Sequence, residues 1–355
     1  MKLSGKNFRS YRILALNFSS KFVVFYGENG AGKTNLLEAI SLFSSDRGLR
    51  KAPLNNLNFV SSPAFSWHLE LFFEQSGYGT QLSTSAPNGR RIARIDGSSV
   101  QSLAKFEELL WILWYVPNMD ILFMGPMSDR RSFFDHLVSA HNKRHKRNLR
   151  QLAELQKERL HVIFHRKDEN WLKVLEEKIA DGNVTVTKSR KEFMELLQST
   201  FAEYPSDFLR PIVSISGEIE QIYAVHSEED AILEIAEILK RNRYADAERQ
   251  STSIGVHRSI WEARHPKTLL DAENCSSGEQ KAFLISLILS VIRISRDHRG
   301  VPLLLLDDVM THLDENSRRD LMNELQNIGV QTFFTGTDIN LFRDVPDSSM
   351  IYRIK

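Results

Sequence analysis

The sequence Gly27-Glu28-Asn29-Gly30-Ala31-Gly32-Lys33-Thr34 follows the apolar run 22–26 and precedes the helix-period segment 35–42. Glycines allow a backbone path that turns successive N–H groups inward around a phosphate. The N-terminus of the following helix adds its positive end. The motif therefore has the form of a phosphate-binding P-loop and lies in the context that a P-loop requires, between a strand and a helix. These eight residues are the predicted contacts of a nucleoside triphosphate.

Two side chains of this motif have chemical roles of their own. Lys33 would contact the β and γ phosphates, and the Thr34 hydroxyl would be a ligand of Mg²⁺. The expected cofactors are therefore ATP and Mg²⁺. A simpler interpretation is a glycine turn that only connects a strand to a helix.

A P-loop requires an acidic partner, and the run 301–306, VPLLLL, ends in Asp307-Asp308. Four consecutive leucines bounded by acids predict a buried central strand of a mainly parallel sheet. We expect Asp307 to hold Mg²⁺ through water and Asp308 to act as the general base on the attacking water. The alternative is a helix cap or a surface pair of acids.

Two shorter motifs narrow the class. Cys275-Ser276-Ser277-Gly278-Glu279-Gln280 precedes the apolar helical segment 282–294, and Leu313-Asp314 follows the acids. Ser277 and Gly278 at a helix start predict an anion site, although such a sequence is also a common helix cap. Together with the P-loop, the two motifs resemble the signature motif and the D-loop of ABC-type ATPases. That resemblance makes Ser277, Gly278 and Asp314 candidate nucleotide contacts.

The set of motifs resembles the RecF family more closely. Its members carry, in the same order, counterparts of the segments 7–11, 27–40, 117–135, 255–258, 276–281 and 303–314. The resemblance implies an α/β fold, an ABC-type P-loop ATPase head with mixed sheets and an inserted helical arm. It places the N-terminal lobe of the head at 1–120, the arm at 121–208 and the C-terminal lobe at 209–355.

The family resemblance also implies a function. ATP would lie between two copies of the chain, with Ser277 and Gly278 of one copy reaching the γ-phosphate held by the other. The dimer would clamp double-stranded or gapped DNA at single-strand gaps, and slow hydrolysis would release it. RecO and RecR would be partners in loading the RecA recombinase.

Several departures separate the chain from other ABC proteins. The segment 113–117 lacks the Gln of transporter ATPases, and the strand 332–335 lacks a switch His. Asp308 stands where most ABC enzymes have Glu, which suggests slow turnover. These departures count against a transporter ATPase subunit. An SMC-like ATP-gated nuclease or nucleotide kinase is the other alternative, but an HxH metal cluster is absent from the sequence.

Composition limits the possibilities further. The 355 residues include 46 Lys and Arg against 45 Asp and Glu, a formal charge of +1 that excludes a uniformly basic protein. The only cysteine, Cys275, cannot form an internal disulfide and fits a reducing compartment. The sequence contains no run of apolar residues long enough for a membrane helix. We therefore expect a cytoplasmic protein without a membrane partner.

Local charge is very different from net charge. The segment 143–167 contains nine Lys and Arg against two Glu, a net charge of +7. A basic stripe on a helical arm is suited to sequence-independent phosphate contacts, although a solvated helix face has the same pattern. The candidate DNA contacts are Arg130, Arg131, Lys143, Arg144, Lys146, Arg147 and Arg150.

Hydrophobic periodicity predicts the remaining elements. Apolar residues at helical spacing fill 126–208, with an expected break at Asp181-Gly182-Asn183. Strands are expected at 213–216 and 222–225, and a helix at 228–241. Turn signals at Pro87-Asn88-Gly89 and Asp96-Gly97 predict hairpins between the earlier strands.

Overall fold

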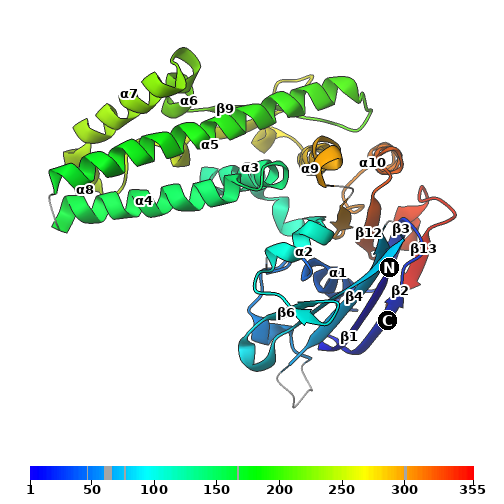
Figure 1. The fold of residues 1–355 in the computed structure, drawn as a ribbon. Coiled ribbons are helices and arrows are strands. Elements are labelled where there is room, and N and C mark those ends of the chain that lie inside the picture. The colour runs from blue at the N-terminus through cyan, green and yellow to red at the C-terminus, as the bar shows by residue number, and fades with distance from the viewer. Residues whose placement is uncertain (46, 60–65, 76, 166–167, 300–301) are drawn as a thin grey trace. The chain divides into compact units, whose positions relative to one another are not determined.

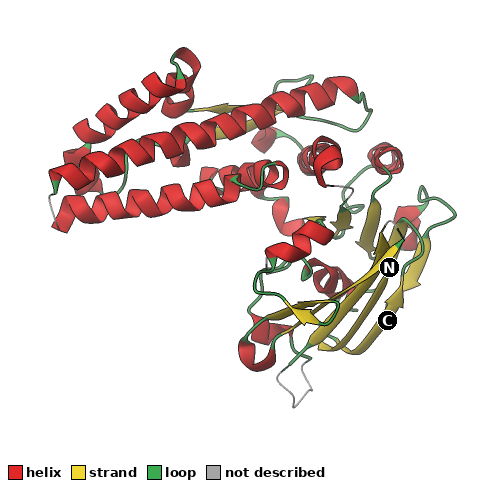
Figure 2. Cartoon of the chain, in the orientation of Figure 1, coloured by secondary structure: helices red, strands yellow, loops and turns green. Residues whose placement is uncertain are grey.

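A computed structural model describes residues 1–45, 47–59, 66–75, 77–165, 168–299 and 302–355. The chain forms two compact units (Figure 1). The sheet unit comprises 1–120, 206–208 and 296–355, and the helical unit comprises 121–205 and 209–295. Figure 2 shows that strands dominate the first unit and helices the second. Within the described residues, we find no helix with the combined length and apolarity of a membrane span.

A parallel sheet forms one layer of the sheet unit, in the order β13-β3-β12-β11-β8. Its strands are β3 (Phe22–Tyr26), β8 (Ile112–Tyr115), β11 (Leu303–Leu306), β12 (Gln331–Gly336) and β13 (Met350–Arg353). All neighbours pair in parallel. Every residue of β11 is buried, as expected for an inner strand of a parallel sheet. The predicted strand is thus confirmed for 303–306, whereas Val301 lies outside the described residues.

The second sheet is antiparallel, in the order β2-β1-β4-β5-β6-β7. Its strands are β1 (Lys2–Phe8), β2 (Tyr11–Asn17), β4 (His68–Gln75), β5 (Tyr78–Ser85), β6 (Ile92–Ile95) and β7 (Ser98–Ser99). Both predicted hairpins are confirmed, because β5 pairs with β6 and β6 with β7. One hydrophobic core joins the two sheets to α1 (Lys33–Ser41), with Leu3, Leu69, Val23, Phe333, Leu36 and Ile40 among its buried members. The helices α2 (Ala104–Leu109) and α10 (Glu315–Ile328) complete this unit.

The helical unit is built on the long helices α4 and α5, which lie side by side (Figure 1). Its elements are α3 (Met127–His141), α4 (His145–His165), α5 (Glu169–Glu203), β9 (Ile212–Ser216), α6 (Glu218–Val225), α7 (Glu228–Arg241), α8 (Arg243–Arg249) and β10 (Ile260–Arg264). The helix α9 (Ser277–Arg299) begins in this unit and ends in the sheet unit.

This unit extends well past the expected arm, 121–208. The strands β9 and β10 pair with each other rather than with either sheet of the sheet unit. The helix α7 packs on α5 through a shared core that includes Ile179, Ala231 and Ile235. Residues 209–295 therefore belong with the helices, and the chain returns to the sheet unit only at residue 296.

The predicted helix break at residues 181–183 is wrong, because α5 runs through them without interruption. Gly182 gives room for α4: a Cβ there would lie 3.1 Å from a methyl group of Leu152. Asn183 donates a hydrogen bond to the carbonyl of Ile179 and accepts one from the backbone N–H of Val256. Tertiary contacts thus stabilise a helix at residues whose local sequence pattern predicts a turn.

The strand predicted at 222–225 is also wrong, because these residues form the second half of α6. Ile219 and Ile222 are both buried in the core shared with α5 and α7. Their spacing of three is the spacing of one helix face. A short apolar run cannot by itself distinguish a strand from a buried helix.

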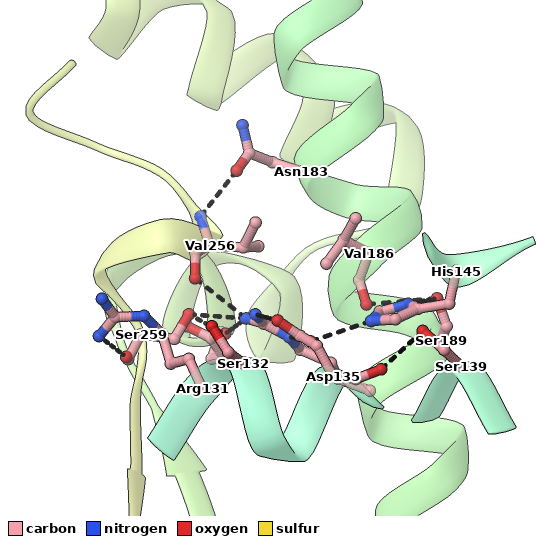
Figure 3. Close-up of polar contacts among 12 residues, drawn as sticks. Arg131, Ser132, Asp135, Ser139, His145, Asn183, Val186, Ser189, Val256 and Ser259 are labelled. Carbon is pink, nitrogen blue, oxygen red and sulfur yellow. Dashed lines mark hydrogen bonds and ion pairs between the residues drawn. The ribbon is translucent and has the colours of Figure 1, made fainter. Parts of the chain in front are cut away.

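A buried polar network joins α3, α4 and α5 (Figure 3). Arg190 makes two hydrogen bonds of 2.8 Å to the carboxylate of Asp135, and His145 Nε2 lies 2.9 Å from the same carboxylate. Burial alone would raise the pKa of Asp135, but these hydrogen bonds hold it below its usual value. His145 also contacts Ser189, whose hydroxyl donates to the carbonyl of Thr185 within its own helix. His145 is fully buried, so the Ser-His-Asp cluster is a packing element rather than a reactive centre.

A second buried cluster surrounds Arg159 of α4. The Arg159 guanidinium pairs with Glu176 at 3.0 Å and with Asp246 at 2.7 Å, and it donates to the carbonyl of Leu239. Arg159 and Asp246 are both fully buried. The ion pairs connect α4 to α5 and α8, so they determine how these helices align.

We expect Arg159→Met to destabilise the helical unit by about 3–5 kcal/mol, because it leaves buried Asp246 without its cation. Arg150→Met is the matched control, since Arg150 lies on the same helix but is exposed. The control should change the free energy of unfolding by no more than about 0.5 kcal/mol. Urea titrations of both variants measure the difference, and equal stabilities would contradict the structural role of the cluster.

Candidate nucleotide-binding site

The P-loop connects β3 to α1 and depends on its glycines. Gly30 and Gly32 have φ angles of 85° and 97°, a region that favours glycine. A Cβ on Gly32 would lie 2.5 Å from the hydroxyl of Ser10, and one on Gly27 would lie 2.1 Å from the carbonyl oxygen of Ile354. The loop is therefore enclosed at both ends and exposed at its tip, where Glu28, Asn29 and Gly30 lie. Ala31 closes the turn with a backbone hydrogen bond to Glu28.

Lys33, the first residue of α1, has its ammonium group inside this loop. Its Nζ donates to the carbonyl oxygens of Gly27 and Glu28, each at 2.7 Å. The side chain is buried, and burial lowers the pKa of Lys33 from its ordinary value. A phosphate in the loop would offer this buried ammonium a charged acceptor, which makes a stronger hydrogen bond than a carbonyl does.

Thr34 and Asp307 lie together although 273 positions separate them in the chain. The Thr34 hydroxyl donates to Asp307 Oδ1 at 2.8 Å. Asp307 is only 5% exposed, and burial raises the pKa of its carboxyl group. Because β3 and β11 run in the same direction, the residues that follow them reach the same edge of the sheet. The predicted pairing of the P-loop with the acid-ended strand therefore has a direct geometric basis.

Asp308 follows in an unusual backbone conformation, with a φ of 49°. Its N–H donates to Thr335 Oγ1 at 2.9 Å, and its carboxylate accepts a hydrogen bond from Thr311 Oγ1 at 2.6 Å. Thr335 in turn donates to Asp307 Oδ1 at 2.6 Å. The sequence analysis missed both threonines, although Thr335 lies in the predicted strand 332–335.

These groups suit a magnesium nucleotide. Hydroxyl and carboxylate oxygens are the ligands that Mg²⁺ prefers, and Thr34 and Asp307 supply one of each within hydrogen-bond distance. The loop provides backbone N–H groups and one cation for phosphates. The residues present therefore fit both expected cofactors.

An ion pair that the sequence analysis did not predict stabilises the position of α1. Glu38 is 1% exposed and accepts two hydrogen bonds of 2.7 Å from Arg9. Arg9 lies in the turn between β1 and β2 with a φ of 51°. Tyr11, the first residue of β2, donates to the carbonyl of Gly32. The segment 7–11 thus fixes the position of the P-loop helix, which explains a motif that the sequence alone could only match to a family.

The predicted signature residues begin α9. Ser276 and Glu279 form a capping box, in which the Glu279 carboxylate accepts from the backbone and hydroxyl of Ser276 at 2.8 Å. These hydrogen bonds hold the pKa of Glu279 below its usual value. Ser277 is exposed and Gly278 half-buried, so the start of the helix is accessible. Both belong to the helical unit, whereas the P-loop belongs to the sheet unit.

Asp314 caps α10. Its carboxylate accepts from the backbone N–H of Ser317 at 2.9 Å and from the Ser317 hydroxyl at 2.7 Å. These contacts lower the pKa of Asp314. Capping α10 is a sufficient role for Asp314 within one chain, so a nucleotide contact would be an additional role.

The contacts of Arg130 within the chain count against its predicted role in DNA binding. Arg130 is 8% exposed, pairs with Glu273 at 2.8 Å and donates to the carbonyl of Phe123. Its neighbour Arg131 is half-buried and donates to the carbonyl of Ser259 at 3.0 Å. Both arginines therefore hold α3 against the rest of the helical unit.

The basic stripe is smaller than its sequence suggests. Arg159 and His145 are buried, and Arg166 and Lys167 lie outside the described residues. The other candidates, at the start of α4 and just before it, are all exposed: Lys143, Arg144, Lys146, Arg147 and Arg150. We call these five residues the basic stripe.

Comparison with known proteins agrees with the motifs. The family model for the RecF/RecN/SMC N-terminal domain matches residues 1–354. A DNA replication and repair protein RecF from Mesorhizobium japonicum is 36% identical over 96% of this chain and 92% of its own length. A RecF protein from Rickettsia bellii is 32% identical over 98% of this chain and 97% of its own.

Solved structures show the same fold. A structure of the recombination mediator protein RecF in the RecFOR pathway superposes with a TM-score of 0.80 at 22% identity, covering 100% of this chain and 95% of the other. An Smc head bound to a domain of ScpA superposes with a TM-score of 0.56 at 16% identity, covering 97% and 91%. The matched fold is that of an ABC-type ATPase head, as predicted. Because the family model and the curated relatives both extend over nearly the whole chain, this protein belongs to the RecF family.

Proposed function

We propose that this protein is an ATP-dependent DNA-binding protein whose P-loop site binds ATP with Mg²⁺ and hydrolyses it slowly. The observation that carries the proposal is the hydrogen bond between Thr34 and Asp307. It brings the phosphate loop and the acid-ended strand into one site. Relatives named as DNA replication and repair proteins, and RecF structures with ATP, support this assignment.

Each group in the site has a chemical role. Lys33 and the backbone of the P-loop hold the phosphates, while Thr34 and Asp307 hold the metal ion. Magnesium, when bound, neutralises charge on the phosphate oxygens. Asp308 orients the attacking water and accepts its proton. A carboxylate shorter than Glu is consistent with slow turnover.

The remaining predicted contacts would be used between two copies of the chain. Ser277 and Gly278 at the start of α9 and Asp314 at the start of α10 offer a helix N-terminus and a carboxylate to a second P-loop. ATP then favours the dimer because it binds across it, and hydrolysis removes that contact. Nucleotide thus acts as a timer for the assembly.

DNA is the partner that the basic stripe suits. Its five exposed cations offer sequence-independent contacts to phosphates. Solved RecF structures are described as belonging to the RecFOR pathway, which supports RecO-type and RecR-type partners. We therefore propose that the ATP-bound dimer holds duplex DNA beside a single-strand gap.

Lys33→Ala should weaken ATP binding at least about tenfold, because a charge-assisted hydrogen bond contributes roughly 1.5–3 kcal/mol. ATP-dependent retention on DNA should be lost with it. Lys21→Ala is the control, since Lys21 is an exposed lysine of the same unit. Calorimetric titration with ATP and Mg²⁺ measures both variants, and equal affinities would rule out the P-loop assignment.

Asp308→Asn should retain ATP binding and slow hydrolysis by about 10²-fold or more, because the amide cannot accept a proton. The amide oxygen can still accept the hydrogen bond from Thr311, so the local structure should remain. Phosphate release measures the rate. Sedimentation with ATP and a gapped duplex should show a trapped DNA-bound dimer. Hydrolysis at the wild-type rate would exclude Asp308 as the base, and an unchanged monomer would exclude the clamp.

Arg147→Glu with Arg150→Glu should weaken binding to all duplex sequences equally and reduce the salt slope of affinity by about 2. The matched control is Lys240→Glu with Arg241→Glu, which changes the charge equally at exposed positions of α7. Fluorescence anisotropy at several salt concentrations gives both slopes. Equal slopes in the two double variants would show that the stripe is an ordinary solvated helix face.

A further inference from the structure

Thr335 occupies a central place beside the two acids. It lies near the end of β12 and is 1% exposed. Its hydroxyl donates to Asp307 Oδ1 at 2.6 Å and accepts from the N–H of Asp308 at 2.9 Å. One oxygen atom therefore contacts the side chain of the first acid and the backbone of the second.

The sheet accounts for this position. In the parallel pairing of β11 with β12, Leu306 is opposite Phe334, so Thr335 lies level with the residue that follows β11. A hydroxyl group has one donor and two acceptor sites, which allows both hydrogen bonds at the same time. Valine has the same shape but can make neither of them.

We infer that Thr335 is a positioning residue for the proposed ATPase, which sets the orientation of Asp307 and Asp308 toward the magnesium nucleotide. The inference rests on the proposed function of this site. It assigns a role to a residue in the strand where the sequence offers no switch His.

Two features connect Thr335 to the orientation of the acids: the hydrogen bonds to Asp307 Oδ1 and the backbone conformation of Asp308. The hydroxyls of Thr34 and Thr335 both donate to Oδ1 of Asp307, so both hydrogen bonds use the same carboxylate oxygen. Asp308 has a left-handed φ of 49°, which costs energy for a residue with a side chain and needs support from its surroundings. The hydrogen bond from Asp308 N–H to Thr335 supports this backbone conformation. The N–H is bonded to the Cα atom that carries the Asp308 side chain, so the same contact helps to set the direction of that side chain.

A different explanation is that Thr335 is only a satisfied core hydroxyl. The same strand offers a control for this explanation in Thr332, which is fully buried. The Thr332 hydroxyl donates to the carbonyl of Val330 at 3.2 Å and contacts neither acid. Valine at Thr332 or at Thr335 thus removes one buried hydroxyl from β12, but only the second change removes contacts to the acids.

The experiment compares Thr335→Val, Thr335→Ser and Thr332→Val with the wild type. Steady-state hydrolysis gives kcat and KM over a series of Mg²⁺ concentrations. Equilibrium binding of a fluorescent ATP analogue, with Mg²⁺ and with EDTA, gives a readout that does not depend on turnover. Thermal unfolding without nucleotide reports on the fold of each variant.

We expect Thr335→Val to lower kcat by about 10–100-fold and to reduce the gain in nucleotide affinity that Mg²⁺ provides, as for other residues that orient metal ligands. Binding in EDTA should be unchanged. Thr335→Ser should restore both properties, and Thr332→Val should behave as the wild type. The inference is overturned if Thr335→Val keeps the wild-type kcat and Mg²⁺ dependence, if serine does not restore them, or if both valine variants lose activity equally. A wild-type protein that binds no nucleotide would instead refute the proposed function itself.

Discussion

The site depends on one contact, the hydrogen bond from the Thr34 hydroxyl to the carboxylate of Asp307. It joins residues near the two ends of the chain, and it forms only when β3, β12 and β11 lie in one parallel sheet in that order. Parallel strands end at the same edge, so the residues after them can meet there without distortion. The all-apolar β11, buried along its whole length, provides the rigid base from which Asp307 and Asp308 project.

The two compact units place their buried polar groups differently. In the sheet unit, Thr34, Asp307 and Thr335 gather at the edge of the parallel sheet, where we propose that they face phosphate and Mg²⁺, while buried Glu38 pairs with Arg9. In the helical unit, buried arginines form ion pairs with carboxylates of the same unit: Arg159 pairs with Asp246, and Arg190 pairs with Asp135. Buried ions of this kind stabilise little in themselves, but the loss of one partner is costly. They therefore specify how the helices align.

Net charge counts buried and exposed side chains alike, so a near-neutral value is not evidence against a nucleic-acid partner. Several cations that the sequence counts toward a basic surface are paired in the interior, among them Arg130 and Arg159. Those that remain exposed, such as Arg147 and Arg150, are close together at the start of α4. Exposure rather than composition thus determines which charges a phosphate backbone could contact.

The sequence by itself determined the features that are local: the glycine loop, the leucine strand with its acids, the hairpin turns and the serine that starts α9. Each depends on a backbone preference or a short-range pattern, and together they were sufficient to identify the family. Only the tertiary structure decided which distant groups meet. A local pattern contains no information about partners that are far away in the chain. Such partners explain why Thr335 contacts Asp307, why Arg9 pairs with Glu38, and why a helix continues through Gly182. The sequence also could not show that Arg159 is buried and Arg150 exposed. A helix face becomes interior only when another element packs on it.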